Sequence, residues 1–203
     1  MERTYVGLIM VSIIIICIYY DWINLLYITA NILVGYDIWY LKYVHNLSTM
    51  IVALFSLSML SFNYMALQLY YHYACDILTI ITIAQLSDVY QYKAGQYFGK
   101  HKVGWISTNK TYEGYIYGWV FTVITYYILY ITQHLAGYNC MAFGCGMITS
   151  IYILGILGGL LSSLFKRLVK IKDYSNVLGP HGGWTDRIDS IIIPMLVYGC
   201  NQL

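Results

Sequence analysis

The chain has 203 residues, of which 60% are hydrophobic and 10% are charged, and its formal net charge is +2. Because a soluble domain carries roughly 25% charged residues, this chain cannot cover itself with a water-facing surface, and we expect an integral membrane protein. The small net charge and the clustering of the basic residues give no support to a nucleic-acid partner. Membrane lipids and a small anionic ligand are the expected partners.

Apolar segments recur along the chain at a length that suits membrane crossing, which takes about 20 mainly apolar residues. The predicted spans are Tyr5–Tyr20, Ile23–Leu41, Ser48–Ser61, Met65–Val89, Gly114–Leu135 and Gly146–Phe165. The third is short, and a seventh run, Ile191–Gly199, is too short to cross. We therefore expect one all-α, polytopic domain with about six transmembrane helices.

The basic residues lie on alternate connecting segments between the predicted spans. All 11 Lys and Arg residues fall on one side, at the N-terminus, near Lys42, and in two large loops over 90–113 and 166–189. The segments expected on the other side, near Asp21, near Asn63 and over Ala136–Cys145, have none. Because basic residues favour the cytoplasmic side of a membrane, both large loops and the N-terminus are predicted to be cytoplasmic.

The first large loop follows Asp88, which stands at the end of a predicted span. An ionisable residue there is costly to place against lipid, so it is a candidate functional residue. The alternative is that it marks only the end of the span. Beyond it lie two segments that each contain Gly and Lys, AGQYFGK at 94–100 and ISTNKTYEG at 106–114.

The second large loop lies within the stretch Ser163–Asp189, which holds five Lys or Arg residues, three aspartates and a Gly-Gly pair. Asp173, Asp186 and Asp189 suit a hard cation such as Mg²⁺, which prefers a few carboxylate oxygens together with phosphate oxygens. Asp186 and Asp189 would share a face of a helix that enters Ile191. Their mutual repulsion is hard to explain there unless a cation binds.

The basic residues and glycines of this loop favour a phosphate ligand. Lys166, Arg167 and Lys172 could balance a triphosphate, and Arg187 could bind a phosphate through two hydrogen bonds. At Gly182 and Gly183 the backbone could approach a phosphate closely, and His181 is assigned a positioning role rather than that of a general base. The alternative is a basic cluster that anchors a helix end to anionic headgroups, but anchoring does not call for three interleaved aspartates.

The Ser163–Asp189 stretch closely resembles the signature of the phosphatidate cytidylyltransferase family. The matching residues are Ser163, Lys166-Arg167, Lys172-Asp173, His181-Gly182-Gly183 and Asp186-Arg187-Ile188-Asp189. The first loop resembles the central region of the same family through Asp88, Ser107, Lys110, Thr111, Glu113 and Gly114. It departs at Thr108, where the family usually has Pro, and at Asn109, where it often has Lys. The resemblance covers about Met65 to Ser190, while residues 1–64 match only in character.

The resemblance implies an enzyme that converts CTP and phosphatidic acid to CDP-diacylglycerol and pyrophosphate, works with Mg²⁺ or alternatively Mn²⁺, and forms a homodimer. Catalysis is assigned to Lys172, Asp173, Asp186 and Asp189, and metal binding to Asp88, Asp173, Asp186 and Asp189. Substrate binding is assigned to Ser107, Lys110, Thr111, Lys166, Arg167, His181, Gly182, Gly183 and Arg187.

Two other functions stay open. One is a related CTP-dependent transferase that acts on another lipid, either an archaeal ether lipid as a CDP-archaeol synthase or a polyprenol as a kinase. The other is a catalytically silent membrane scaffold. The retained carboxylates argue against the scaffold. The reaction products would distinguish a phosphatidate cytidylyltransferase from the related CTP-dependent transferases.

Overall fold

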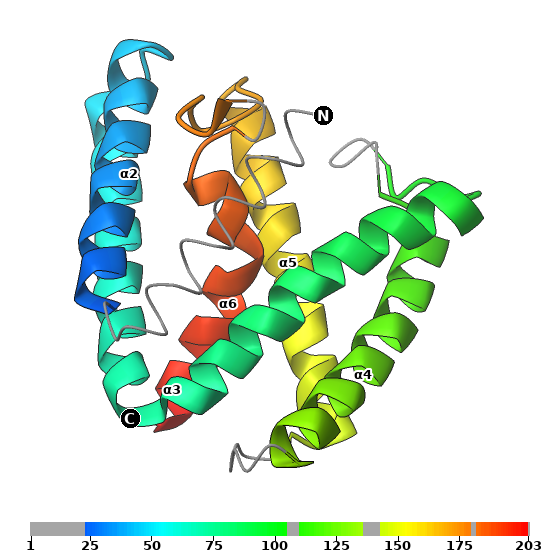
Figure 1. Ribbon diagram of the computed structural model, residues 1–203. Helices are drawn as coiled ribbons and strands as arrows, with labels where there is room; N and C mark the ends of the chain where they lie inside the picture. The colour runs from blue at the N-terminus through cyan, green and yellow to red at the C-terminus, as the bar shows by residue number, and fades with distance from the viewer. Residues whose placement is uncertain (1–22, 105–109, 136–142, 180–181, 203) are drawn as a thin grey trace. The chain divides into compact units, whose positions relative to one another are not determined.

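The computed structural model describes residues 23–104, 110–135, 143–179 and 182–202 of the chain (Figure 1). Its helices are α2 (Ile23–Tyr43), α3 (Thr49–Phe98), α4 (Tyr112–Leu135), α5 (Cys145–Leu168) and α6 (Thr185–Gln202). Over these ranges no strand forms, and one isolated antiparallel bridge pairs Lys102 with Thr111. The all-α prediction is confirmed.

Three of these helices are long and apolar enough to cross a membrane: Thr49–Phe98, Tyr112–Thr132 and Cys145–Leu168. They confirm the prediction of a membrane protein, but not the count of six spans. The predicted span Tyr5–Tyr20 lies outside the described residues. The run Ile191–Gly199 forms part of α6, which begins six residues earlier than the run, at Thr185.

Helix α3 joins what the sequence predicted as two spans. The helical dihedral angles fail at Tyr73 (φ −138°, ψ 42°) rather than near Asn63, where a loop was expected. That expectation was wrong, because Asn63 is buried in α3 and its amide donates a hydrogen bond of 3.4 Å to the side-chain oxygen of Asn31 on α2. The amide nitrogen of this side chain therefore has a partner inside the protein, and the chain stays helical there.

The chain divides into two compact units, each built from two separate segments. The first comprises Met1–Leu67 and Lys166–Ile188, and the second comprises Gln68–Phe165 and Asp189–Leu203. Most of the second predicted loop therefore belongs to the first unit, and the loop after Asp88 belongs to the second unit.

In the first unit, the segment after α5 packs onto α2 and the first part of α3. Val34 and Leu41 of α2 are almost completely buried. The ring of Tyr174 stacks on that of Phe55, with 5.1 Å between ring centroids and 27° between planes. Because such aromatic pairs add to the stabilisation by burial, this contact helps to hold the loop between α5 and α6 against the helices.

In the second unit, small residues let the helices approach closely, as in other membrane proteins. A Cβ atom on Gly158 of α5 would lie 2.5 Å from the carbonyl oxygen of Asp189. A Cβ atom on Gly118 of α4 would lie 2.9 Å from both the Gln91 and the Tyr152 side chains. Helices α4, α5 and α6 are thus held at positions that larger residues would not allow.

Candidate functional site

The loop of the first unit begins with a sharp turn at the end of α5. Lys170 has a left-handed backbone (φ 59°). The N–H of Ile171 donates to the carbonyl of Lys166 at 2.9 Å, and the N–H of Lys170 donates to that of Arg167 at 3.1 Å. These two bonds form a Schellman motif, which ends a helix and satisfies its last carbonyl groups. The turn redirects the chain, so Lys172 and Asp173 leave the axis of α5.

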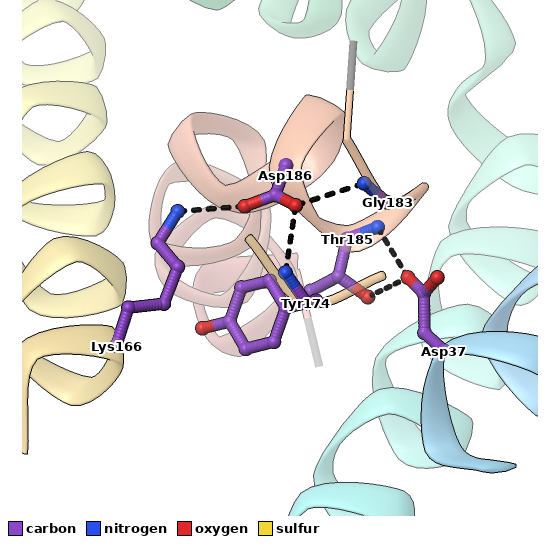
Figure 2. A network of polar contacts seen from close by, with 6 residues as sticks. All are labelled: Asp37, Lys166, Tyr174, Gly183, Thr185 and Asp186. Carbon is purple, nitrogen blue, oxygen red and sulfur yellow. Dashed lines mark hydrogen bonds and ion pairs between the residues drawn. The ribbon is translucent and has the colours of Figure 1, made fainter. Parts of the chain in front are cut away.

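Asp186, in the first turn of α6, binds three donors from different parts of this loop (Figure 2). Its Oδ1 accepts a 2.6 Å bond from Nζ of Lys166, the last-turn lysine of α5. Its Oδ2 accepts bonds of 2.9 Å from the backbone N–H groups of Tyr174 and Gly183. The side chains of Lys166 and Asp186 are only 12% and 3% exposed, so their ion pair is largely shielded from solvent.

Asp37 of α2 is a second buried carboxylate that binds the same loop. Its Oδ1 accepts a 2.5 Å bond from the Ser175 hydroxyl group. Its Oδ2 accepts bonds of 2.8 Å from both the N–H and the hydroxyl group of Thr185 (Figure 2). From the sequence, Asp37 is predicted only as an interhelical polar contact or an interfacial residue, because no motif surrounds it. Its only sequence signal is that a carboxylate in an apolar helix is costly without partners.

The Gly182-Gly183 pair fits between these carboxylates. Gly182 has a left-handed backbone (φ 79°), and a Cβ atom there would lie 3.0 Å from Oδ2 of Asp186 and 3.3 Å from Cγ of Asp173. A Cβ atom on Gly183 would lie 2.9 Å from Oδ1 of Asp37. The glycines therefore let aspartates approach the backbone. The predicted approach of a phosphate to the same glycines stays a prediction.

Asp173 differs from Asp186 in what surrounds it. It is half-buried, and no described residue donates a hydrogen bond to its carboxylate or forms an ion pair with it. Lys172, Arg167 and Arg187 are exposed. The first unit thus brings Lys166, Asp173, Asp186 and the two glycines together, with exposed cations in the same segments.

In the second unit the fold brings Asp88 to Lys110. Nζ of Lys110 lies 3.7 Å from Oδ1 of Asp88. It also lies 5.8 Å from the centre of the Tyr115 ring and 3.5 Å from where a Cβ atom on Gly159 would be. The two side chains are 27% and 36% exposed, so this pair is open to solvent and to a ligand.

Thr111 and Glu113 hold the end of the same loop. The Thr111 hydroxyl oxygen accepts a 3.1 Å bond from the N–H of Gly114, which caps the start of α4. Glu113 Oε2 accepts bonds of 3.1 Å from the N–H groups of Lys100 and His101, and its Oε1 lies 2.5 Å from Nδ1 of His101. The sequence analysis did not identify His101. Ser107 and His181, two predicted substrate-binding residues, lie outside the described residues.

The predicted metal ligands fall in both units: Asp173 and Asp186 in the first, Asp88 and Asp189 in the second. Among the described residues no three His, Cys, Asp or Glu side chains gather as a metal site would require. A carboxylate has about four lone-pair positions, and Asp186 already accepts three hydrogen bonds. Asp173, without a partner among the described residues, therefore suits Mg²⁺ best, and Asp186 has little capacity left.

Comparisons with known proteins give a consistent result. The model of the cytidylyltransferase family matches residues 3–200. Phosphatidate cytidylyltransferase of Aquifex aeolicus is 35% identical over 114 residues, which are 56% of this chain and 41% of the relative. The enzyme of that name from Staphylococcus haemolyticus is 34% identical over 149 residues, 68% of this chain and 56% of the relative. The chain thus spans about half the length of the curated relatives it matches.

Proposed function

The chain belongs to the cytidylyltransferase family, and on that premise we propose that it is a phosphatidate cytidylyltransferase. In this reaction a phosphate oxygen of phosphatidic acid attacks the α-phosphorus of CTP. The new P–O bond forms as the bond from the α-phosphorus to the bridging oxygen breaks, which releases pyrophosphate and leaves CDP-diacylglycerol. The lipid phosphate is already an anion at neutral pH, so its activation needs no general base.

The observation that carries the proposal is the loop in which Lys166, Asp173 and Asp186 converge around Gly182-Gly183. Transfer between two anions depends mainly on positioning and on neutralising phosphate charge. Exposed Arg167, Lys172 and Arg187 supply positive charge in the same stretch. Such a loop can bind a triphosphate while its buried ion pair keeps the backbone rigid.

In the first unit we assign Mg²⁺, with Mn²⁺ as the alternative, to Asp173 and to the acceptor capacity left on Asp186. In the second unit Asp88 and Asp189 keep their proposed metal-binding roles. When bound, the cation would neutralise charge on the phosphates. Lys110 is assigned to substrate binding, because its partly exposed pair with Asp88 leaves the ammonium group accessible to a phosphate. Ser107, Thr111 and His181 keep their proposed substrate-binding roles.

We also propose that the protein crosses the membrane several times, with both motif loops on the cytoplasmic side, and that it forms a homodimer. The support for the topology is the distribution of the 11 basic residues. The break at Tyr73 fits it, because the neighbouring residues 70–75 contain no Lys or Arg.

The test is an assay of the purified protein in detergent, with CTP labelled at either the α- or the γ-phosphate and a panel of lipid acceptors. We expect label from α-labelled CTP in a CDP-lipid when phosphatidic acid is the acceptor, with release of pyrophosphate. A CDP-lipid formed only with an ether-lipid acceptor would indicate a different lipid substrate. Transfer of the γ-label to a polyprenol would indicate a kinase, and no transfer to any acceptor would indicate a scaffold. Each of these three results would overturn the proposal.

A further inference from the structure

Asp37 lies on the buried face of α2. Val34 and Leu41, at positions three before it and four after it, are 0% and 1% exposed, and Asp37 itself is 0% exposed. Residues at these spacings share one face of a helix. A carboxylate on such a face is costly unless hydrogen bonds satisfy it. The bonds from Ser175 and Thr185 do so, and among the described residues no Lys, Arg or His pairs with it.

The bond from the Thr185 N–H gives Asp37 a specific position relative to α6. Thr185 is the first residue of α6, and the first N–H groups of a helix have no partner within the helix. Asp37 accepts one of them at 2.8 Å. A negative charge is also favoured at this end of a helix. Asp37 therefore caps the start of α6. The capping side chain belongs to another helix, α2, and not to the residue directly before α6.

Asp37 and Asp186 hold neighbouring residues of the same two segments. Asp186 binds the N–H of Tyr174, and Asp37 binds the side chain of the next residue, Ser175. On the other segment Asp37 binds Thr185, which directly precedes Asp186. Asp173 directly precedes Tyr174. Asp173 and Asp186, two of the residues assigned to the reaction, are thus each within two positions of a residue that Asp37 binds.

From this arrangement we infer that Asp37 is a positioning residue: through Ser175 and Thr185 it sets the placement of the Asp173 and Asp186 carboxylates. The inference rests on the proposed function, since it assigns these two carboxylates to the reaction. Asp37 acts through other residues and contacts no reacting atom in this scheme.

The test compares Asp37→Asn with Asp76→Asn. Asp76 is a matched control, because it is a buried carboxylate on a predicted span that accepts a 2.5 Å bond from Tyr198 in the second unit. Asn keeps the shape of Asp but offers one acceptor oxygen instead of two. Because small misplacements of reacting groups cost about 100-fold in rate, we expect Asp37→Asn to lower kcat by about that factor, with KM for CTP within about twofold. Asp76→Asn should leave kcat of the folded protein within about twofold.

A second measurement is hydrogen exchange of peptides covering 172–188, which does not depend on activity. Exchange there should become about tenfold faster in Asp37→Asn, as expected for loss of a net 1.4 kcal/mol of protection, and stay unchanged in Asp76→Asn. Wild-type kcat and unchanged exchange in Asp37→Asn would overturn the inference, as would equal effects in Asp76→Asn.

Two other results are informative: an Asp37→Asn variant that does not fold, and a wild-type protein without activity. If Asp37→Asn does not fold, Ser175→Ala and Thr185→Val decide, because each removes a neutral hydroxyl group that binds Asp37. The Ser175 hydroxyl oxygen also accepts a 3.3 Å bond from the N–H of Val177, so Thr185→Val is the more specific of the two. Unchanged kcat and exchange in both would overturn the inference. A wild-type protein without activity overturns the proposed function instead, and the exchange comparison then still decides whether Asp37 holds the loop.

Discussion

Lys166 and Asp186 form an ion pair of 2.6 Å that joins the last turn of α5 to the first turn of α6. The two residues are 20 positions apart, and the pair closes the loop that contains Asp173 and the two glycines. Nζ of Lys166 also lies 5.2 Å from the centre of the Tyr174 ring. The pair thus fixes both the ends and the interior of this loop.

Replacing Lys166 with Met should destabilise the protein and abolish activity. Removing one partner of a buried ion pair leaves an uncompensated charge, which costs about 3–5 kcal/mol. The measurement is thermal unfolding in detergent together with CTP incorporation into lipid. Lys172→Met is the control, because Lys172 is exposed: it should lower activity and leave the unfolding temperature unchanged. Equal unfolding temperatures for both variants would contradict a stabilising role of the pair.

Asp173→Asn and Asp186→Asn should each abolish CTP incorporation into lipid while the protein still inserts into membranes. Their effects on stability should differ, because Asp186 accepts three hydrogen bonds and Asp173 has no such partner among the described residues. We expect a loss of about 3–5 kcal/mol for Asp186→Asn, because it leaves the largely buried Lys166 ammonium group without its charge partner, and none for Asp173→Asn. Near wild-type activity in either variant would refute the assignment of that carboxylate to the reaction.

Chelation of divalent cations with EDTA should stop the reaction, and added Mg²⁺ should restore it. The physical reason is that transfer between CTP and an anionic lipid needs neutralisation of phosphate charge. The measurement is turnover at increasing total Mg²⁺ after chelation, with Mn²⁺ in a parallel series. Turnover that continues without any divalent cation would rule out the proposed metal requirement.

Gly183→Ala should destabilise the loop, because the new methyl group would lie 2.9 Å from Oδ1 of Asp37 and 3.0 Å from the backbone nitrogen of Ser175. Overpacking of this kind costs about 1–3 kcal/mol. The matched control is Gly35→Ala on α2, where nothing lies within 4 Å of the new atom, so it should be neutral or stabilising. Thermal unfolding of the two variants is the measurement, and equal unfolding temperatures would show that the site tolerates a side chain.

Lys110→Met should weaken CTP binding with little effect on stability. The Asp88–Lys110 pair is partly exposed and 3.7 Å long, and pairs of this kind contribute at most about 1 kcal/mol. A charged hydrogen bond to a phosphate is stronger, so KM for CTP should rise about tenfold. Lys93→Met, which removes an exposed lysine from α3, is the control and should leave KM unchanged. An unchanged KM in Lys110→Met would argue against phosphate binding by Lys110.

The sequence predicts helices well where the signal is local. Apolar runs over Ile23–Leu41, Gly114–Leu135 and Gly146–Phe165 correspond to α2, α4 and α5, which each extend them by only a few residues. The break in α3 was misplaced, because Asn63 looks like a loop residue until its partner Asn31 on another helix is known. The helix expected to carry Asp186 and Asp189 into Ile191 is α6, which begins at Thr185. The sequence did not show that the carboxylate of Asp37, on another helix, stabilises its polar first turn.

In the candidate site, too, residues of one local motif could be predicted, and contacts between distant segments could not. The motif residues Lys166, Asp173, Gly182, Gly183 and Asp186 were predicted, and the fold brings them into one loop. Asp37 could not be assigned to this loop from the sequence, because its partners Ser175 and Thr185 lie 138 and 148 positions further along the chain. The pairing of Asp88 with Lys110 likewise depends on how the chain returns to α3.

The separation between Asp37 and its partners also bears on biosynthesis. A ribosome completes α2 long before it reaches Ser175, so during most of translation the Asp37 carboxylate has none of the three donors that later satisfy it. The Asp37 carboxylate must therefore be hydrated, or bonded to other donors, until Ser175 and Thr185 have been synthesised. The loop can close only after that point, so a nascent chain that ends before Thr185 has an incomplete candidate site.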